Sequence, residues 1–118
     1  MDLTDLIVIR GVLKRHGFRF SKSLGQNFLT DPSVCPRMAL ACGADRSTGV
    51  LEIGPGFGVL TKELSAQAGK VVAVELDESL LPVLGETLAG CRNVEIIRGD
   101  VLKLDLAKLL REKFGGMK

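Results

Sequence analysis

The stretch V-L-E-I-G-P-G-F-G, residues 50–58, decides the fold of this chain. It begins as an apolar run typical of a β-strand and ends in glycines at three alternate positions, Gly54, Gly56 and Gly58. A helical pattern follows from residue 59 to residue 68. A strand, a glycine turn and a helix in this order bring the backbone close to a nucleotide-like ligand, because glycine adopts positive φ and carries no Cβ. The alternative is that the glycines only make a tight turn.

Outward from this stretch, strands alternate with helices. The apolar runs predict strands at 49–54, Lys70–Glu75 and Val94–Arg98. Apolar spacing and glycine stops predict helices at 4–16, 32–41, 59–68, 78–88 and Leu106–Phe114. Residues 18–24 are expected to be an extended basic linker. The residues predicted to end helices are glycines: Gly17, Gly43, Gly69, Gly90 and Gly115. The residues predicted to cap helix starts are Thr30 or Asp31, before Pro32, and Asp77.

This alternation predicts an α/β fold with a parallel sheet and right-handed crossovers. The continuous apolar content of the first strand favours a strand buried on both faces. A doubly wound sheet places its first strand near the middle, yet only three strands are predicted. We therefore expect the chain to be the N-terminal part of a longer protein, with one edge of the first strand open. Self-association through that edge is one way to cover it.

Composition narrows the class of protein. The chain of 118 residues has room for one small domain, and its hydrophobic content of 46% suits a globular core. No apolar run is long enough to cross a membrane, and Asp2 and Asp5 argue against an import presequence. The three cysteines lack a C-x-x-C pair, which indicates reduced structural thiols in a cytoplasmic protein and no metal site.

Positive charge is concentrated near the N-terminus. The segment 10–37 carries a net charge of +5, which leaves −3 for the rest of a chain whose net charge is +2. Such an arm suggests a polyanionic partner, although an ordinary solvated helix face is the alternative. The candidate phosphate-binding residues are Arg10, Lys14, Arg15, Arg19 and Lys22.

Acidic residues follow the second and third predicted strands. Glu75 ends the second strand, 17 residues past Gly58, where a carboxylate can accept both hydroxyls of a ribose. Asp100 follows the third strand, where an acceptor can meet the amino group of adenine. Glu75 could instead be a solvated acid, and Asp100 a turn or cap residue. For Asp77 the capping role is the preferred interpretation.

The glycine spacing separates two classes of cofactor. Dinucleotide enzymes use G-x-G-x-x-G, but the third position falls here on Val59. The pattern E-x-G-x-G-x-G, which starts at Glu52, resembles that of Rossmann-like S-adenosylmethionine-dependent methyltransferases. An NAD-dependent oxidoreductase domain is the alternative, which competition between NADH and S-adenosylhomocysteine would test.

The segment K-S-L-G-Q-N-F-L-T-D, residues 22–31, makes the resemblance specific. Together with E-I-G-P-G, E-L-D and G-D, it resembles the rRNA adenine N6,N6-dimethyltransferase family, and the L-G-Q-N-F-L form favours its small-subunit branch. The resemblance implies S-adenosylmethionine as cofactor and small-subunit rRNA in a preribosomal particle as substrate. It implies two parts, an N-terminal helix and basic arm with a cofactor-covering segment at 1–31 and a partial Rossmann-like domain at 32–118. The implied cofactor contacts are Gln26, Asn27, Leu29, Gly54, Gly56, Glu75 and Asp100.

One family motif is missing from these residues. In the family, an N-L-P-Y motif after the fourth strand holds the adenine amine, and no such motif occurs in this sequence. The resemblance therefore implies a cofactor-binding part that does not methylate adenine by itself. The alternative is a non-catalytic RNA-binding or ribosome-assembly module that keeps the fold without the chemistry. Without the family, Gln26 and Asn27 would be interpreted as a turn.

Overall fold

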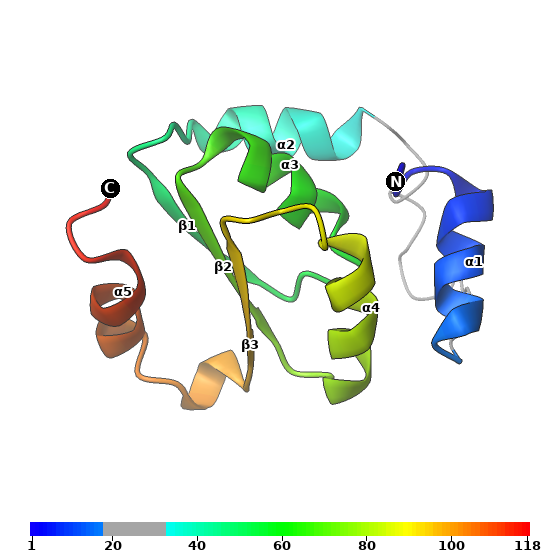
Figure 1. Cartoon of the computed structure of the whole chain (residues 1–118). Helices are drawn as coiled ribbons and strands as arrows, with labels where there is room; N and C mark the ends of the chain where they lie inside the picture. The colour runs from blue at the N-terminus through cyan, green and yellow to red at the C-terminus, as the bar shows by residue number, and fades with distance from the viewer. Residues whose placement is uncertain (18–32) are drawn as a thin grey trace.

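A computed structural model describes residues 1–17 and 33–118, and Figure 1 shows their arrangement. Three strands form the sheet, and helices connect and flank them. In chain order the elements are α1 (Leu6–Arg15), α2 (Val34–Cys42), β1 (Gly49–Ile53), α3 (Val59–Gln67), β2 (Lys70–Glu75), η3 (Glu78–Leu80), α4 (Leu81–Thr87), β3 (Val94–Arg98), η4 (Val101–Lys103) and α5 (Leu106–Phe114).

The sheet is parallel, with strand order β1-β2-β3. This confirms the predicted α/β fold with three parallel strands. β2 is central, and its residues Val71, Val72 and Ala73 are fully buried. As expected, β1 lies at an edge of the sheet that the described residues form. The prediction that β1 is buried on both faces is wrong, because its first four residues are only half-buried and its last residue, Ile53, is 51% exposed.

Along the outer edge of β1, the described residues provide a backbone hydrogen-bond partner only at the start of the strand. Gly49 N–H donates to the Lys118 carbonyl at 2.9 Å, and Lys118 N–H donates to the Ser47 carbonyl at 3.1 Å. Beside this contact, Phe114 of α5 packs on Gly49, where a Cβ would lie 2.1 Å from the ring. Gly49 is therefore required for the close approach of α5 to β1.

The termini of α1 and α2 differ from the predictions by one or two residues. α1 begins at Leu6 because Asp5 caps it, its side chain accepting from Ile7 N–H at 2.9 Å. α2 begins after Ser33, so the predicted caps at Thr30 and Asp31 lie outside the described residues. Gly43 ends α2 with a φ of 69°, as predicted.

The predicted helix 78–88 is divided in two. Asp77 caps the short helix η3, and α4 follows with Pro82 in its first turn. Proline is tolerated there because a backbone N–H in the first turn would have no partner within the helix. The predicted end at Gly90 is wrong, because Leu88 is the C-cap and donates its N–H to the Leu84 carbonyl. β1 and α3 each end one residue earlier than predicted, while the bounds of β2, β3 and α5 match the prediction.

Two apolar clusters hold the elements together. The first joins α1 to residues beside the glycine turn, and the second lies under α2 and α3. α1 packs beside α4, whereas α5 lies at the opposite end of the molecule (Figure 1). In residues 1–17 and 33–118, no helix combines the length and the apolar content that a bilayer crossing needs.

Candidate functional site

The glycine turn after β1 uses its three glycines in two ways. All three have positive φ: 70° at Gly54, 59° at Gly56 and 88° at Gly58. A Cβ added to Gly54 or Gly56 would meet nothing within 4 Å, so the space beside them is open. A Cβ on Gly58 would lie 3.0 Å from Thr87 Oγ1. The first two glycines therefore leave room for a ligand, and the third allows close packing against α4.

The carboxyl ends of the three strands lie at the same edge of the sheet as this turn. Gly54 N–H donates to the Val74 carbonyl at 2.9 Å, and Gly99 N–H donates to the Glu75 carbonyl at 2.9 Å. Gly56 N–H reaches Glu75 Oε1 at 3.4 Å. The structure thus brings the glycine turn, the end of β2 and the loop after β3 to one edge of the sheet, as expected for parallel strands.

Glu75 is the buried acid of this edge, with 6% of its surface exposed. Its Oε2 accepts from Asp77 N–H at 2.9 Å, and its Oε1 faces Gly56 N–H. A carboxylate offers about four acceptor positions, so these two N–H groups leave acceptor capacity for a ligand. The two backbone donors also fix the carboxylate in place before any ligand arrives.

The two aspartates near Glu75 both act as caps. Asp77 accepts from Ser79 N–H at 3.0 Å, which confirms its predicted capping role. Asp100 caps η4, because its Oδ1 accepts from Leu102 N–H at 2.9 Å. This is the alternative that the sequence left open for Asp100, and contact of its side chain with a nucleobase stays a prediction.

A pair that the sequence did not reveal spans the glycine turn. Thr61 in α3 donates its hydroxyl to Glu52 Oε1 in β1. Thr61 is fully buried, and burial raises the pKa of Glu52 above its ordinary value while the hydrogen bond from Thr61 opposes that shift. The only indication in the sequence was Glu52 at the head of the glycine pattern, since its partner is nine residues away.

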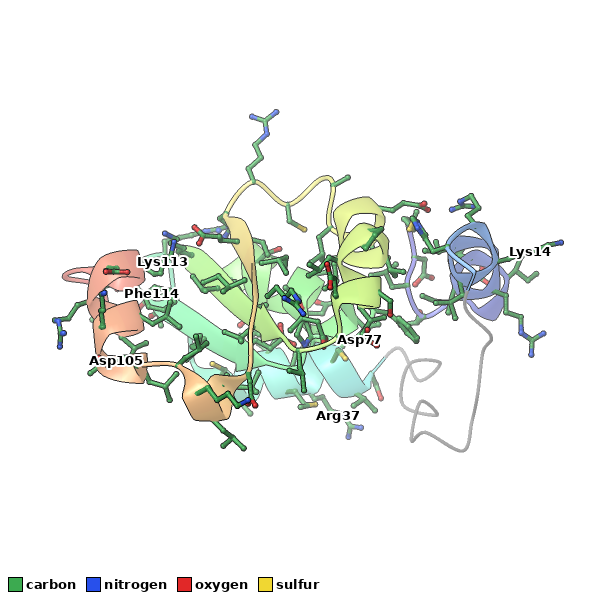
Figure 2. All side chains as sticks on the ribbon, turned by 90° about the horizontal axis from the view of Figure 1, so that it is seen from below. Lys14, Arg37, Asp77, Asp105, Lys113 and Phe114 are labelled. Carbon is green, nitrogen blue, oxygen red and sulfur yellow. The ribbon has the colours of Figure 1, made fainter. Side chains whose placement is uncertain are left out.

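The basic residues of α1 have different surroundings. Arg10 and Lys14 are exposed, and Lys14 projects from the end of the molecule opposite α5 (Figure 2). Arg15 forms an ion pair with Glu86 of α4, and its hydrogen bond holds the pKa of Glu86 below the usual value. His16 Nε2 lies 3.2 Å from Glu86 Oε1. Lys14 is therefore available to an anion, while Arg15 already has a carboxylate partner.

Five predicted site residues lie outside the described residues. These are the basic residues Arg19 and Lys22 and the predicted cofactor contacts Gln26, Asn27 and Leu29. Their roles stay predictions.

The fold and these strand ends define a class of protein. The chain has the first three parallel strands and crossover helices of the Rossmann-like methyltransferase fold, and it covers part of that fold. A family profile described as "Ribosomal RNA adenine dimethylase" matches residues 17–116. The chain belongs to this family.

Individual relatives agree with this assignment. The chain is 46% identical over 117 residues to a "Ribosomal RNA small subunit methyltransferase A" of Bacillus pumilus, covering 99% of this chain and 40% of that protein. It superposes on a crystal structure of the 23S rRNA methyltransferase ErmE with a TM-score of 0.58 and 36% identity, over 61% of this chain and 30% of that one. The N-terminal domain of EvdMO1, whose structure contains S-adenosylhomocysteine (SAH), matches with a TM-score of 0.56 and 29% identity, over 64% of this chain and 34% of that one. The chain thus spans less than half the length of the relatives it matches.

Proposed function

We propose that this chain is the cofactor-binding part of an S-adenosylmethionine-dependent rRNA adenine N6,N6-dimethyltransferase. The observation that carries the proposal is the buried Glu75 carboxylate, which backbone N–H groups of Gly56 and Asp77 hold beside an open glycine turn. Family membership and neighbours such as EvdMO1 support the choice of cofactor. The division into an arm at 1–31 and a partial domain at 32–118 belongs to the same proposal.

The residues present fit this cofactor. Gly54 and Gly56 leave open space at the strand end, where backbone can approach a ligand without side-chain obstruction. The remaining acceptor positions of Glu75 suit the two ribose hydroxyls, and Asp100, which follows β3, would accept from the amino group of the adenine. Gln26, Asn27 and Leu29 would cover the methionine end.

The chemistry that the cofactor supplies when bound is an electrophilic methyl group on sulfur. The described residues of this chain bind and orient it, and Glu75 holds the ribose in one position. Positioning is the main contribution to transfer onto a weak nucleophile such as the adenine amine. The family's N-L-P-Y clamp for that amine is not among these 118 residues, so we propose that the chain alone does not methylate adenine.

The proposed substrate is small-subunit rRNA in a cytoplasmic ribosome precursor, with phosphates bound by the basic residues of α1 and the arm after it. Of these, Lys14 is exposed and projects outward (Figure 2). Neutralising one phosphate contact lowers the salt dependence of binding, with a loss of slope of about 0.7–0.9. We expect Lys14→Gln to show this loss with an rRNA fragment. Lys108→Gln on α5, which removes the same charge at the other end of the molecule, is the control and should leave the slope unchanged.

The cofactor assignment is tested by calorimetric titration of the chain with SAH and, separately, with NADH. Binding of SAH without binding of NADH supports the proposal. Binding of NADH alone would show instead a dinucleotide site, despite the glycine spacing. Adenine methylation by the 118-residue chain alone would contradict the proposed division of labour.

A further inference from the structure

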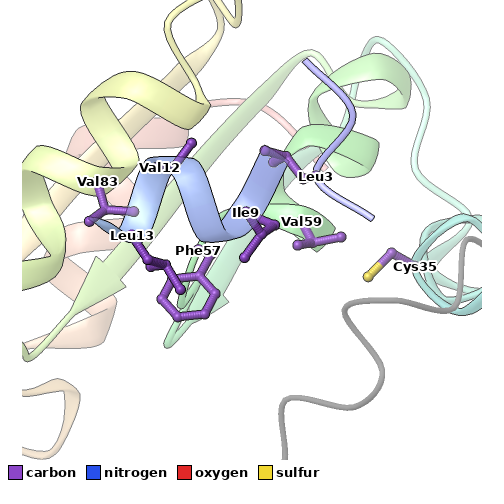
Figure 3. Close-up of a cluster of buried hydrophobic side chains, with 8 residues drawn as sticks. All are labelled: Leu3, Ile9, Val12, Leu13, Cys35, Phe57, Val59 and Val83. Atoms are coloured by element: carbon purple, nitrogen blue, oxygen red, sulfur yellow. The ribbon is translucent and has the colours of Figure 1, made fainter. Parts of the chain in front are cut away.

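Phe57 has an unusual position, because it lies inside the glycine turn and is nevertheless buried. Its neighbours Gly56 and Gly58 both have positive φ, yet only 6% of the Phe57 surface is exposed. Figure 3 shows where the ring goes, with the side chains of Ile9 and Leu13 directed toward it. The turn is therefore attached to the N-terminal helix through one aromatic side chain.

α1 presents a continuous apolar face to this ring. Ile9 and Leu13 are four residues apart, which places them on the same side of a helix, and they are 2% and 1% exposed. Val59, the first residue of α3, belongs to the same cluster, so one apolar cluster joins α1, Phe57 and the start of the helix that follows the turn.

Polar contacts fasten both ends of the N-terminal segment over the turn. Near its start, Lys62 of α3 donates to the Met1 carbonyl. At the end of α1, Arg15 and His16 both contact Glu86 of α4. The segment is thus bound to α3, which follows the turn directly, and to α4, against which Gly58 of the turn packs.

Few polar contacts hold the glycine turn itself to the sheet. Within it, Gly58 N–H donates to the Pro55 carbonyl at 2.9 Å, which closes a local turn but does not attach it to the sheet. The described side-chain contact to the sheet is from Gly56 N–H to Glu75 at 3.4 Å, a long hydrogen bond. The start of the turn is also held, because Gly54 N–H donates to the Val74 carbonyl at 2.9 Å. Beyond Gly54, packing of Phe57 is the main contact that sets the position of the turn relative to its surroundings.

We propose that α1 positions the glycine turn of the cofactor site through Phe57, so that Ile9 and Leu13 control cofactor affinity without touching the cofactor. They are positioning residues. The part of this inference that concerns the cofactor rests on the proposed function. The part that concerns the position of the turn can be measured without a ligand.

The experiment compares two leucine-to-alanine variants of the full chain. Leu13→Ala removes packing against Phe57, while Leu64→Ala removes an equally buried leucine from the second cluster, which contains Ala39, Ala68 and Val71. Should either variant fail to fold by circular dichroism, Val12→Ala and Val71→Ala form a milder pair of fully buried valines, one from each cluster.

Two quantities are measured on each folded variant. The first is the ratio of amide hydrogen-exchange rates at Gly58 and Gly99, whose N–H groups donate to the Pro55 and Glu75 carbonyls and which belong to neither cluster. The second is the dissociation constant for SAH. In the variant of the cluster beside the turn, we expect the exchange ratio and the dissociation constant for SAH each to rise about fivefold or more. A fivefold change is about the lower end of typical coupling between sites. For the control cluster we expect the ratio to stay as in the wild type.

Each outcome decides a different statement. An exchange ratio that is the same in both variants overturns the inference, whatever the SAH result. A raised ratio with no SAH binding by the wild-type chain overturns the proposed function and the cofactor part of the inference, and leaves the positioning of the turn by α1 standing. A raised ratio with an unchanged dissociation constant shows that the turn position does not govern binding, which overturns the inference about affinity.

Discussion

Two buried threonines offer a sharp test of the structure, because the same substitution should have opposite effects on them. Thr61 is 0% exposed and donates to the Glu52 carboxylate across the glycine turn. Thr87 is 5% exposed, and its hydroxyl is the one buried side-chain polar atom without a hydrogen-bond partner among the described residues. Valine has nearly the same shape as threonine without the hydroxyl.

The expected magnitudes follow from these surroundings. A hydrogen bond to a charged group contributes about 1.5–3 kcal/mol, so Thr61→Val should lower the free energy of unfolding by that amount. At about 4 °C per kcal/mol for a chain of this size, the melting temperature should fall by about 6–12 °C. Thr87→Val removes a buried unpaired hydroxyl, whose burial costs about 1–3 kcal/mol, and should raise the free energy of unfolding by about 1 kcal/mol.

The assay is urea unfolding followed by circular dichroism, with the m-value checked for constancy so that midpoints report stability. The reasoning is refuted if the two variants shift the midpoint in the same direction by the same amount. It is also refuted if Thr61→Val stays within about 0.5 kcal/mol of the wild type, the range of an ordinary surface change.

Three further predictions use the same measurement. Gly58→Ala should lower the free energy of unfolding by at least about 1–2 kcal/mol, because alanine is strained at a φ of 88°. Gly85→Ala, which has open space around it inside α4, should raise the free energy of unfolding by about 0.5–1 kcal/mol. Equal effects of the two substitutions would contradict the positive φ at Gly58. Because the pKa of Glu52 is raised in the folded protein, the contribution of Glu52 to stability is present below its unfolded pKa of 4.5 and is lost as pH rises through the folded value. The stability of Glu52→Gln relative to the wild type should therefore increase with pH across that window. A relative stability that falls with pH would show that the carboxylate is not desolvated. Gly49→Ala should cost about 1–3 kcal/mol through overpacking against Phe114, and a neutral result would show that α5 does not dock on β1.

Local sequence patterns were sufficient to predict much of the fold. The bounds of β2, β3 and α5 match because each is an apolar or amphipathic run between residues that end it, such as Gly69, Gly99 and Gly115. The partial exposure of β1 was not predictable in this way, because an apolar run does not show which residues will cover the two faces of the strand. Burial depends on the neighbours that the strand finds, and those are set by the whole fold.

The candidate site shows the same division. Glu75 could be predicted because its place at the end of β2 follows from strand length alone. The packing of Phe57 on α1 could not, since the contact joins residues about 45 positions apart in the sequence. Glu86 is 71 residues from Arg15 and 70 residues from His16, and only the docking of α1 beside α4 brings these side chains together.

The measurement that tests the central claim most directly is calorimetric titration of SAH into the wild type, Glu75→Gln and Glu78→Gln. Both substitutions neutralise a glutamate, but Glu78 is 73% exposed and pairs with Arg98 on the surface. Loss of a charged acceptor for one ribose hydroxyl should weaken binding to Glu75→Gln about 10- to 100-fold. Glu78→Gln should bind like the wild type. Equal affinity of the wild type and a folded Glu75→Gln variant would contradict the account, because the buried carboxylate would then not be the ribose acceptor.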